Sequence, residues 1–67
     1  MNQSAQQLAD FLLRRGEVEK IAGISRATIY RLMKAGKFPR PVSIGTSAIR
    51  WKQSDVTAWL QSLNTTA

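Results

Sequence analysis

The sequence has neither cysteine nor histidine among its 67 residues. Without cysteine there are no disulfides, thiolate metal ligands or cysteine nucleophiles. Without histidine, the usual general base and the commonest metal ligand are missing. The four carboxylates are a poor stock for acid–base chemistry. These absences predict a protein that is not an enzyme and that binds no metal and no cofactor.

Long apolar runs are also missing from the chain. No stretch approaches the roughly 18 apolar residues of a membrane helix, and the polar start, rich in Gln and Ala, does not resemble a signal peptide. We therefore expect a cytoplasmic, nucleoid-associated protein with no membrane partner. A chain of this length forms one domain at most. We expect a flexible tail over residues 1–10, a folded domain over 11–63 and a frayed end over 64–67.

The positive charge of the chain is concentrated in one stretch. The net charge is +6, with ten basic residues against four acidic ones. Residues 25–52 hold seven of the ten bases and no acid, whereas residues 1–24 balance three bases against three acids. Nucleic acid is the partner that such a stretch predicts, because each phosphate neutralised by Lys or Arg releases condensed counterions.

A short helix is predicted over residues 17–22. Val18, Ile21 and Ala22 are spaced i, i+3 and i+4, the pattern of a helix with one buried face. Gly23 then ends the helix, since glycine readily adopts the left-handed conformation of a sharp exit.

A second helix is predicted over residues 25–35. Ser25 is a good N-cap, Ile24 before it can pack against Ile29 as a hydrophobic staple, and Gly36 closes the helix. The helical period places one apolar stripe inward and leaves a basic stripe outward. The inward residues are Ile29, Leu32 and Met33; the outward ones are Arg26, Ala27, Tyr30, Arg31 and Lys34.

Two short helices joined at residues 23–25 have the spacing of a helix-turn-helix, whose second helix enters the major groove of DNA. Glu19 departs from this pattern, because the close approach of the helices usually requires a small residue there. It should either tilt the first helix or point past the contact. The positions expected to be buried are Val18, Ala22, Ile24, Ile29 and Leu32.

After the prolines at 39 and 41, the chain predicts a hairpin and a last helix. Residues 42–44 and 49–52 alternate as strands, with a turn at 45–48. We expect Val42, Ile44, Ile49 and Trp51 to face the core, and Ser43, Arg50 and Lys52 to face water or a ligand. For the last helix we expect Ser54 as cap, a buried stripe and a neutral packing role; the stripe comprises Val56, Trp59, Leu60 and Leu63.

Several of these segments together resemble the AlpA-type prophage regulators, relatives of the excisionases and of MerR-type winged-helix domains. The resemblance covers about residues 13–63. It rests on Glu17-Val18, Gly23-Ile24-Ser25-Arg26, Thr28-Ile29-Tyr30-Arg31-Leu32, Gly36-Lys37-Phe38-Pro39, Gly45, Arg50-Trp51, Asp55-Val56 and Trp59-Leu60. It implies a mainly α fold with a small β-hairpin: a compact winged helix-turn-helix of three short helices and a two- or three-stranded wing.

The resemblance also implies control of prophage or mobile-element genes, typically by activating integrase expression, or the direction of excision. It assigns Arg26, Ala27, Tyr30 and Arg31 to the exposed recognition helix. It assigns Thr46, Ser47 and Arg50 to the wing.

Side-chain chemistry predicts roles for these positions. Ser25 and Thr28 near the helix N-terminus can donate to phosphate, and Arg26 and Arg31 can read guanine through two bonds each. Ala27 can touch a thymine methyl group. The residues expected to hold phosphates and set register are Tyr30, Lys34, Arg50 and Lys52.

The sequence is compatible with more than one function. The leading hypothesis is a sequence-specific regulator of transcription that binds double-stranded DNA, with helix 25–35 in the major groove and wing 42–52 on the backbone or minor groove. The rivals are an excisionase-like architectural protein and a basic protein-interaction or RNA-binding module. Candidate protein partners are a second copy on paired or tandem sites, an integrase and RNA polymerase. Arg14 and Arg15 could contact phosphate or simply form surface, as could Lys37 and Arg40.

Overall fold

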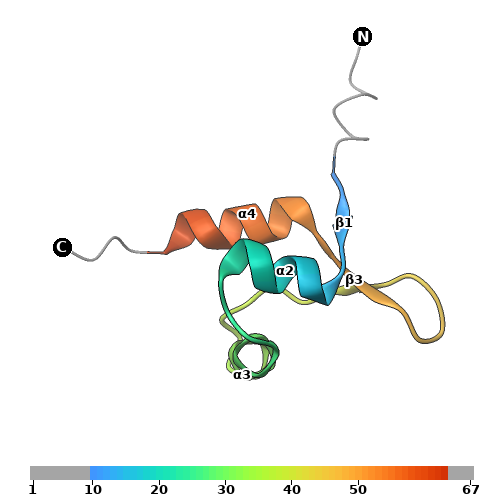
Figure 1. The fold of residues 1–67 in the computed structure, drawn as a ribbon, viewed down its shortest axis with the longest axis horizontal. Helices are drawn as coiled ribbons and strands as arrows, with labels where there is room; N and C mark the ends of the chain where they lie inside the picture. The colour runs from blue at the N-terminus through green and yellow to red at the C-terminus, as the bar shows by residue number, and fades with distance from the viewer. Residues whose placement is uncertain (1–9, 64–67) are drawn as a thin grey trace, which may run out of the picture.

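The computed structural model describes residues 10–63, which form three helices and a three-stranded antiparallel sheet in the strand order β1-β3-β2 (Figure 1). The mainly α, winged helix-turn-helix prediction is confirmed. The tail and frayed end expected from the sequence lie outside the described residues, except for Asp10. In chain order the elements are β1 (Leu12–Leu13), α2 (Arg15–Ala22), α3 (Arg26–Lys34), β2 (Val42–Ser43), β3 (Ile49–Lys52) and α4 (Gln53–Ser62).

Local capping explains the ends of α2. The helix begins at Arg15, two residues earlier than predicted, and Glu17 Oε1 accepts a 2.7 Å hydrogen bond from the backbone N–H of Arg14. At the other end Gly23 has φ of 71°, and its N–H donates to the carbonyl of Glu19. This left-handed residue turns the chain sharply toward the next helix, as the sequence predicts.

Local signals also delimit α3. Ser25 is its N-cap and accepts a hydrogen bond from the backbone N–H of Thr28. After the helix, Gly36 has φ of 74° and the N–H of Lys37 donates to the carbonyl of Leu32 at 2.8 Å. The predicted start and end of this helix are therefore confirmed to within one residue.

The hairpin register differs from the prediction. Val42 lies opposite Arg50 and Ser43 opposite Ile49, and the N–H of Ile44 donates to the carbonyl of Ala48. This hydrogen bond encloses residues 45–47, one residue fewer than the predicted turn of residues 45–48. A one-residue change in register moves every side chain of a strand to the other face.

This register corrects the predicted inward positions of the hairpin. Val42 shares the face of Arg50 and is only half-buried, and Ile44 is 47% exposed. Ile49 lies on the face of Trp51 but near the turn, beyond the core, and is 37% exposed. Only Trp51 of the four is fully buried. It lies opposite Leu13 of β1, which is also buried.

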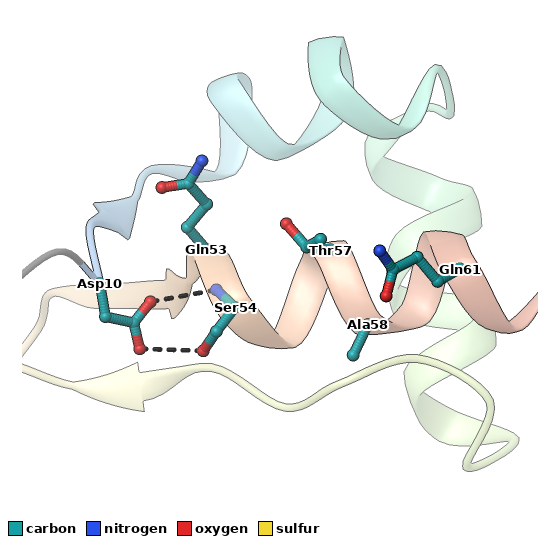
Figure 2. A pocket seen from close by; sticks show the side chains of 6 residues that line it. All are labelled: Asp10, Gln53, Ser54, Thr57, Ala58 and Gln61. Carbon is teal, nitrogen blue, oxygen red and sulfur yellow. Dashed lines mark hydrogen bonds between the residues drawn. The ribbon is translucent and has the colours of Figure 1, made fainter. Parts of the chain in front are cut away.

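The start of α4 is stabilised by a residue remote in sequence. The helix begins at Gln53 rather than after Ser54, so the prediction of Ser54 as the cap is wrong. Instead, the carboxylate of Asp10 accepts hydrogen bonds from the N–H of Ser54 (3.0 Å) and from its hydroxyl (2.9 Å), as Figure 2 shows. The N–H of Gln53 donates to the carbonyl of Phe11. The chain before β1 therefore satisfies amides that a helix start leaves without partners.

The core is small and centred on β3 and the helices that pack against it. Trp51 donates from Nε1 to the carbonyl of Pro39 at 2.9 Å, so its one polar atom is satisfied. Trp59 packs edge-on against Phe38 with ring centroids 4.7 Å apart, and its Nε1 donates to the carbonyl of Lys37. Both tryptophans thus stabilise the loop after α3 from within. The buried core comprises Leu13, Val18, Ile29, Phe38, Trp51 and Val56.

Two residues predicted to be inward on the helices are also exposed. Ile21 is 47% exposed because the eight-residue α2 buries a narrow stripe centred on Val18. Leu63 is 52% exposed because it follows the last residue of α4 in an extended conformation and leaves the helical period. Within residues 10–63, no helix has the length and apolar character needed to cross a membrane.

Candidate nucleic-acid interface

The exposed side of α3 is the strongest candidate for a ligand-binding surface. Ile29 is fully buried, and Leu32 and Met33 pack half-buried against the core, so the opposite side of the helix faces outward. This confirms the predicted orientation of the helix. In Figure 1, α3 is seen nearly end-on below α2, and α4 lies on the far side of α2. We call the exposed residues of α3 the recognition face: Arg26, Ala27, Tyr30, Arg31 and Lys34.

Two residues of the recognition face support each other. The guanidinium carbon of Arg26 lies 5.7 Å from the centre of the Tyr30 ring, one helical turn away. This is within the range of a cation–π contact. Tyr30 itself is 36% exposed. The contact orients the Arg26 guanidinium above the ring instead of leaving it to sample solvent.

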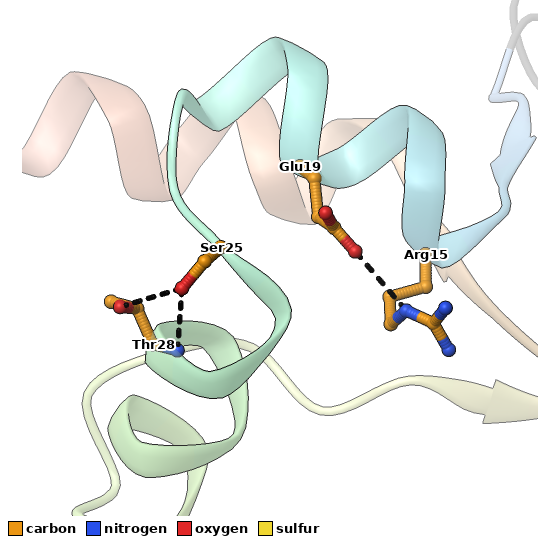
Figure 3. Close-up of polar contacts among 4 residues, drawn as sticks. All are labelled: Arg15, Glu19, Ser25 and Thr28. Carbon is orange, nitrogen blue, oxygen red and sulfur yellow. Dashed lines mark hydrogen bonds and ion pairs between the residues drawn. The ribbon is translucent and has the colours of Figure 1, made fainter.

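A chain of side-chain hydrogen bonds holds the first turns of α3 (Figure 3). The Ser25 hydroxyl donates to Thr28 Oγ1 at 3.1 Å and accepts from the Thr28 N–H at 3.3 Å. Arg31 Nη2 also donates to Thr28 Oγ1, at 3.1 Å. The Ser25 proton is thus engaged by Thr28, while the Thr28 hydroxyl keeps its own proton for another acceptor. Thr28 therefore positions the guanidinium of Arg31.

Glu19 departs from the usual helix-turn-helix pattern without disturbing the fold. Its carboxylate accepts from Arg15 Nε at 3.1 Å, one turn earlier on α2, and Figure 3 shows it directed toward that residue. It is the single salt bridge within residues 10–63. The acid thus points along its own helix instead of into the contact with α3, which is the second of the two possibilities that the sequence leaves open.

The hairpin forms the predicted wing. Its loop projects beyond the body of the molecule on the side away from α4's C-terminal end (Figure 1). Thr46 and Ser47 are exposed at the turn, and Arg50 is half-buried at its base. Arg50 Nη1 donates to the carbonyl of Ile49 at 2.8 Å, which holds the guanidinium along the strand. The structure therefore brings these three predicted residues together.

Lys52 lies apart from that group. It is two residues further from the turn than Arg50, opposite Leu12, and directly precedes α4. Its charge acts on Asp10 and helps to lower the pKa of that carboxyl group. Its neighbours are thus the start of α4 and the strand β1, and its predicted phosphate contact stays a prediction.

A basic hollow lies between α2 and the wing, and neither of the two segments that line it predicts it alone. Its volume is about 480 Å³. Arg14 and Arg15 reach it from the start of α2 and Arg50 from β3. The pair Arg14-Arg15 was visible in the sequence, but its proximity to Arg50 depends on the pairing of β1 with β3. The remaining lining residues are Gly16, Ser47, Ala48 and Ile49.

A second hollow, of about 400 Å³, runs along α4 and has a different character (Figure 2). Beside Asp10 and Ser54, its lining is neutral: Gln53, Thr57, Ala58 and Gln61. The two hydrogen bonds from Ser54, first that of its N–H and then that of its hydroxyl, hold the pKa of Asp10 below the ordinary value of 3.8. The carboxylate is already engaged with the helix, so this surface is structural.

These features define a winged helix-turn-helix with a basic, outward-facing second helix. The sequence pattern of the family described as "Prophage CP4-57 regulatory protein (AlpA)" matches residues 11–64, and the chain belongs to this family, a family of DNA-binding regulators of phage origin. The resemblance identified from the sequence is therefore confirmed.

A phage protein is similar to most of the chain. The "Uncharacterized protein ORF88" of Enterobacteria phage P4 is 48% identical over 48 residues, which cover 72% of this chain and 54% of that protein. The chain thus spans about half the length of this curated relative. No solved structure matches the chain.

Proposed function

We propose that the protein is a sequence-specific regulator of transcription that binds double-stranded DNA of a prophage or mobile element. In this proposal α3 lies in the major groove and the wing contacts the backbone or minor groove. The observation that carries it is the recognition face: three cationic side chains and a tyrosine stand outward on a helix whose other side is buried. A helix of this width fits the major groove of B-DNA.

The arginines of the recognition face would read bases. A guanidinium can bond guanine O6 and N7 at once, which discriminates against a wrong base by about 1–3 kcal/mol. The Tyr30 ring beneath Arg26 and the Thr28 hydroxyl beside Arg31 support this role, because they restrict where the two guanidinium groups point. Ala27, exposed between them, leaves room for a thymine methyl group.

Other residues would fix the register of the protein on the duplex. We assign Thr28, Tyr30, Lys34, Arg50 and Lys52 to phosphate contacts, with Thr46 and Ser47 at the wing. Ser25 would join them only by turning its hydroxyl from Thr28 to a phosphate. Such contacts carry affinity but little sequence information. One helix and one wing cover a short DNA site. The proposal therefore includes a second copy of the protein, bound to a paired or tandem site.

Fluorescence anisotropy with duplex DNA tests the proposal. The target would first be found by footprinting the DNA that flanks the gene, and then compared with random duplex across a salt series. We expect tighter binding to the footprinted site and a steep decrease of affinity with salt. Equal affinity for both duplexes would contradict sequence-specific recognition. Competition by RNA or an acidic polypeptide at fixed salt tests the two other classes of partner.

A transcription regulator and an excisionase-like protein can be distinguished by the product that each changes. A regulator changes a transcript through RNA polymerase, whereas an excisionase-like protein changes a recombination product through an integrase. A promoter reporter and an excision assay, run with the same Arg26→Ala variant, distinguish them. A footprint that spreads cooperatively over adjacent sites would favour the architectural role.

A further inference from the structure

The basic hollow between α2 and the wing brings Arg50 and Ser47, which the proposed function already places on DNA, beside Arg14 and Arg15, which have no role in it. It joins Arg14 and Arg15, from the start of α2, to Arg50 of β3, and Ser47 of the turn completes its rim. We propose that this hollow is a backbone clamp that holds the phosphates of the DNA strand running between the recognition helix and the wing. This inference rests on the proposed function, because it assumes that duplex DNA is the ligand.

The arginines retain hydrogen-bonding capacity toward an anion. Arg15 uses Nε to bind Glu19, so its two terminal nitrogens have no partner within the described part of the chain, and Figure 3 shows them directed away from that carboxylate. Arg50 uses only Nη1, on a backbone carbonyl. Terminal guanidinium nitrogens bind phosphate oxygens in pairs.

The nearby acids contact Arg14 and Arg15 but lie outside the hollow. Glu17 accepts from the N–H of Arg14, and Glu19 from Arg15. Neither carboxylate lines the hollow. Three guanidinium groups thus share one concave surface. Glu19 partly neutralises that of Arg15, whereas Arg14 and Arg50 form no salt bridge within residues 10–63, and an entering phosphate would supply one. A hollow of about 480 Å³ has room for one or two phosphate groups.

The position of the hollow suits contact with the DNA backbone better than contact with the bases. It lies where the N-terminal end of α2 meets the hairpin, and α3 follows the other end of this eight-residue helix after one tight turn. A strand bordering the major groove that holds α3 would pass this junction on its way to the wing. The clamp would therefore fix how α3 and the wing engage the duplex together, with no preference for sequence.

The test measures the salt dependence of DNA binding by the full chain carrying both Arg14→Gln and Arg50→Gln. The slope of log K against log salt should become shallower by about one to two units, since each phosphate contact contributes about 0.9. The affinity for the footprinted site and for random duplex should fall by the same factor. The doubly substituted Arg14→Lys and Arg50→Lys chain, which keeps both charges, should retain most of the slope.

Lys20→Gln is the matched control, because Lys20 is an exposed base on the same helix that does not line the hollow. It should leave the slope unchanged. An equal loss of slope in this control, or a full slope in the Arg14→Gln and Arg50→Gln chain, would overturn the clamp. Unchanged melting curves would show that each variant is folded, which is expected because these side chains lie outside the core.

Neutral methylphosphonate linkages, placed at one backbone position at a time, locate the clamp on the duplex. One or two positions should weaken binding by the wild-type chain and not by the Arg14→Gln and Arg50→Gln chain. If every position costs both chains the same, the hollow holds no phosphate. A wild-type chain that binds no duplex at all would instead refute the proposed function, so the two failures are distinguishable.

Discussion

Helices α3 and α4 are similar in length but differ in how they are held and in what they present. The cap of α3 is Ser25, the residue directly before it, and its outer face is cationic. The start of α4 is held by Asp10, 44 residues earlier, and its outer face is neutral. The helix that would meet DNA is thus organised by its own sequence, and the helix that closes the fold is organised by distant contacts.

There is a physical reason why α3 relies on local contacts and α4 on distant ones. A DNA-reading helix needs side chains with defined directions, and short-range contacts such as Arg26 with Tyr30 and Arg31 with Thr28 supply them. A small domain also needs long-range links, because one thin core provides limited stability. Trp59 and Asp10 supply such links from opposite ends of α4. Substitutions on the two helices should therefore have separable effects, on binding for α3 and on folding for α4 and the core it covers.

The largest expected effect is on the core side. Trp51→Ala should unfold the domain, because truncating a buried aromatic residue costs about 3–5 kcal/mol, close to the whole stability of so short a chain. Trp51 is fully buried and holds the Pro39 carbonyl. A thermal melt followed by circular dichroism would show the loss. Leu63→Ala, at a site 52% exposed, is the control and should melt almost as wild type. A cooperative melt near the wild-type temperature in Trp51→Ala would contradict the described core.

The next effect concerns the recognition face and should leave folding intact. Arg26→Ala should weaken binding by about 1–3 kcal/mol, concentrated at the base pair that Arg26 reads. Anisotropy titrations against single-base variants of the footprinted site would measure it. Lys52→Ala is the comparison: it should weaken all duplexes alike and reduce the salt slope by about one unit. A uniform loss in Arg26→Ala would assign that residue to phosphate instead of to a base.

A smaller effect tests whether α3 depends on its own cap. Ser25→Ala removes the acceptor for the Thr28 N–H and should cost about 1 kcal/mol of stability. It also frees Thr28, and through it Arg31, so discrimination at the base read by Arg31 should decrease more than overall affinity. Ser25→Asp restores the acceptor and should recover the melting temperature. Stability unchanged in Ser25→Ala would mean that α3 is held by packing alone.

The contrast between short-range and long-range contacts also explains which features of the fold could be predicted from the sequence. The orientation of α3, its cap and the glycines at both of its ends follow from contacts within a few residues, and these predictions agree with the structure. The register of the hairpin does not follow from such local contacts. A turn of residues 45–47 and a turn of residues 45–48 both fit the alternation of the strands, and the pairing of Val42 with Arg50 decides between them. The prediction that Val42 and Ile44 share the face of Trp51 is therefore wrong.

Contacts between residues far apart in the sequence could not be predicted from local sequence patterns. Ser54 resembles an N-cap by type and position, yet the acceptor at the start of α4 is Asp10. Likewise, Arg14 and Arg15 are candidate phosphate contacts from the sequence, but their proximity to Arg50 follows only from the pairing of β1 with β3. Both depend on the register of β1 on β3, which the two-residue strand β1 is too short to encode in its sequence.

The smallest effect tests the long-range link of α4. Asp10 has a pKa below its ordinary 3.8, mainly because the Ser54 N–H and then its hydroxyl donate to the carboxylate, with a further contribution from the charge of Lys52. A lowered pKa in the folded state means that the ionised group stabilises the fold above about pH 4, and that this stabilisation is lost as pH falls through the folded pKa.

Asp10→Asn should accordingly lower the melting temperature by a few degrees at neutral pH, since an exposed carboxylate contributes little. The difference from wild type should shrink toward zero as the pH is lowered from about 6 to 2. Melting curves of both chains across that range measure it. Subtracting one from the other removes the contribution of Glu17, Glu19 and Asp55, which both chains share. A difference that stays constant with pH would mean that the link does not depend on the charge of Asp10, and α4 would then be held by its buried stripe alone.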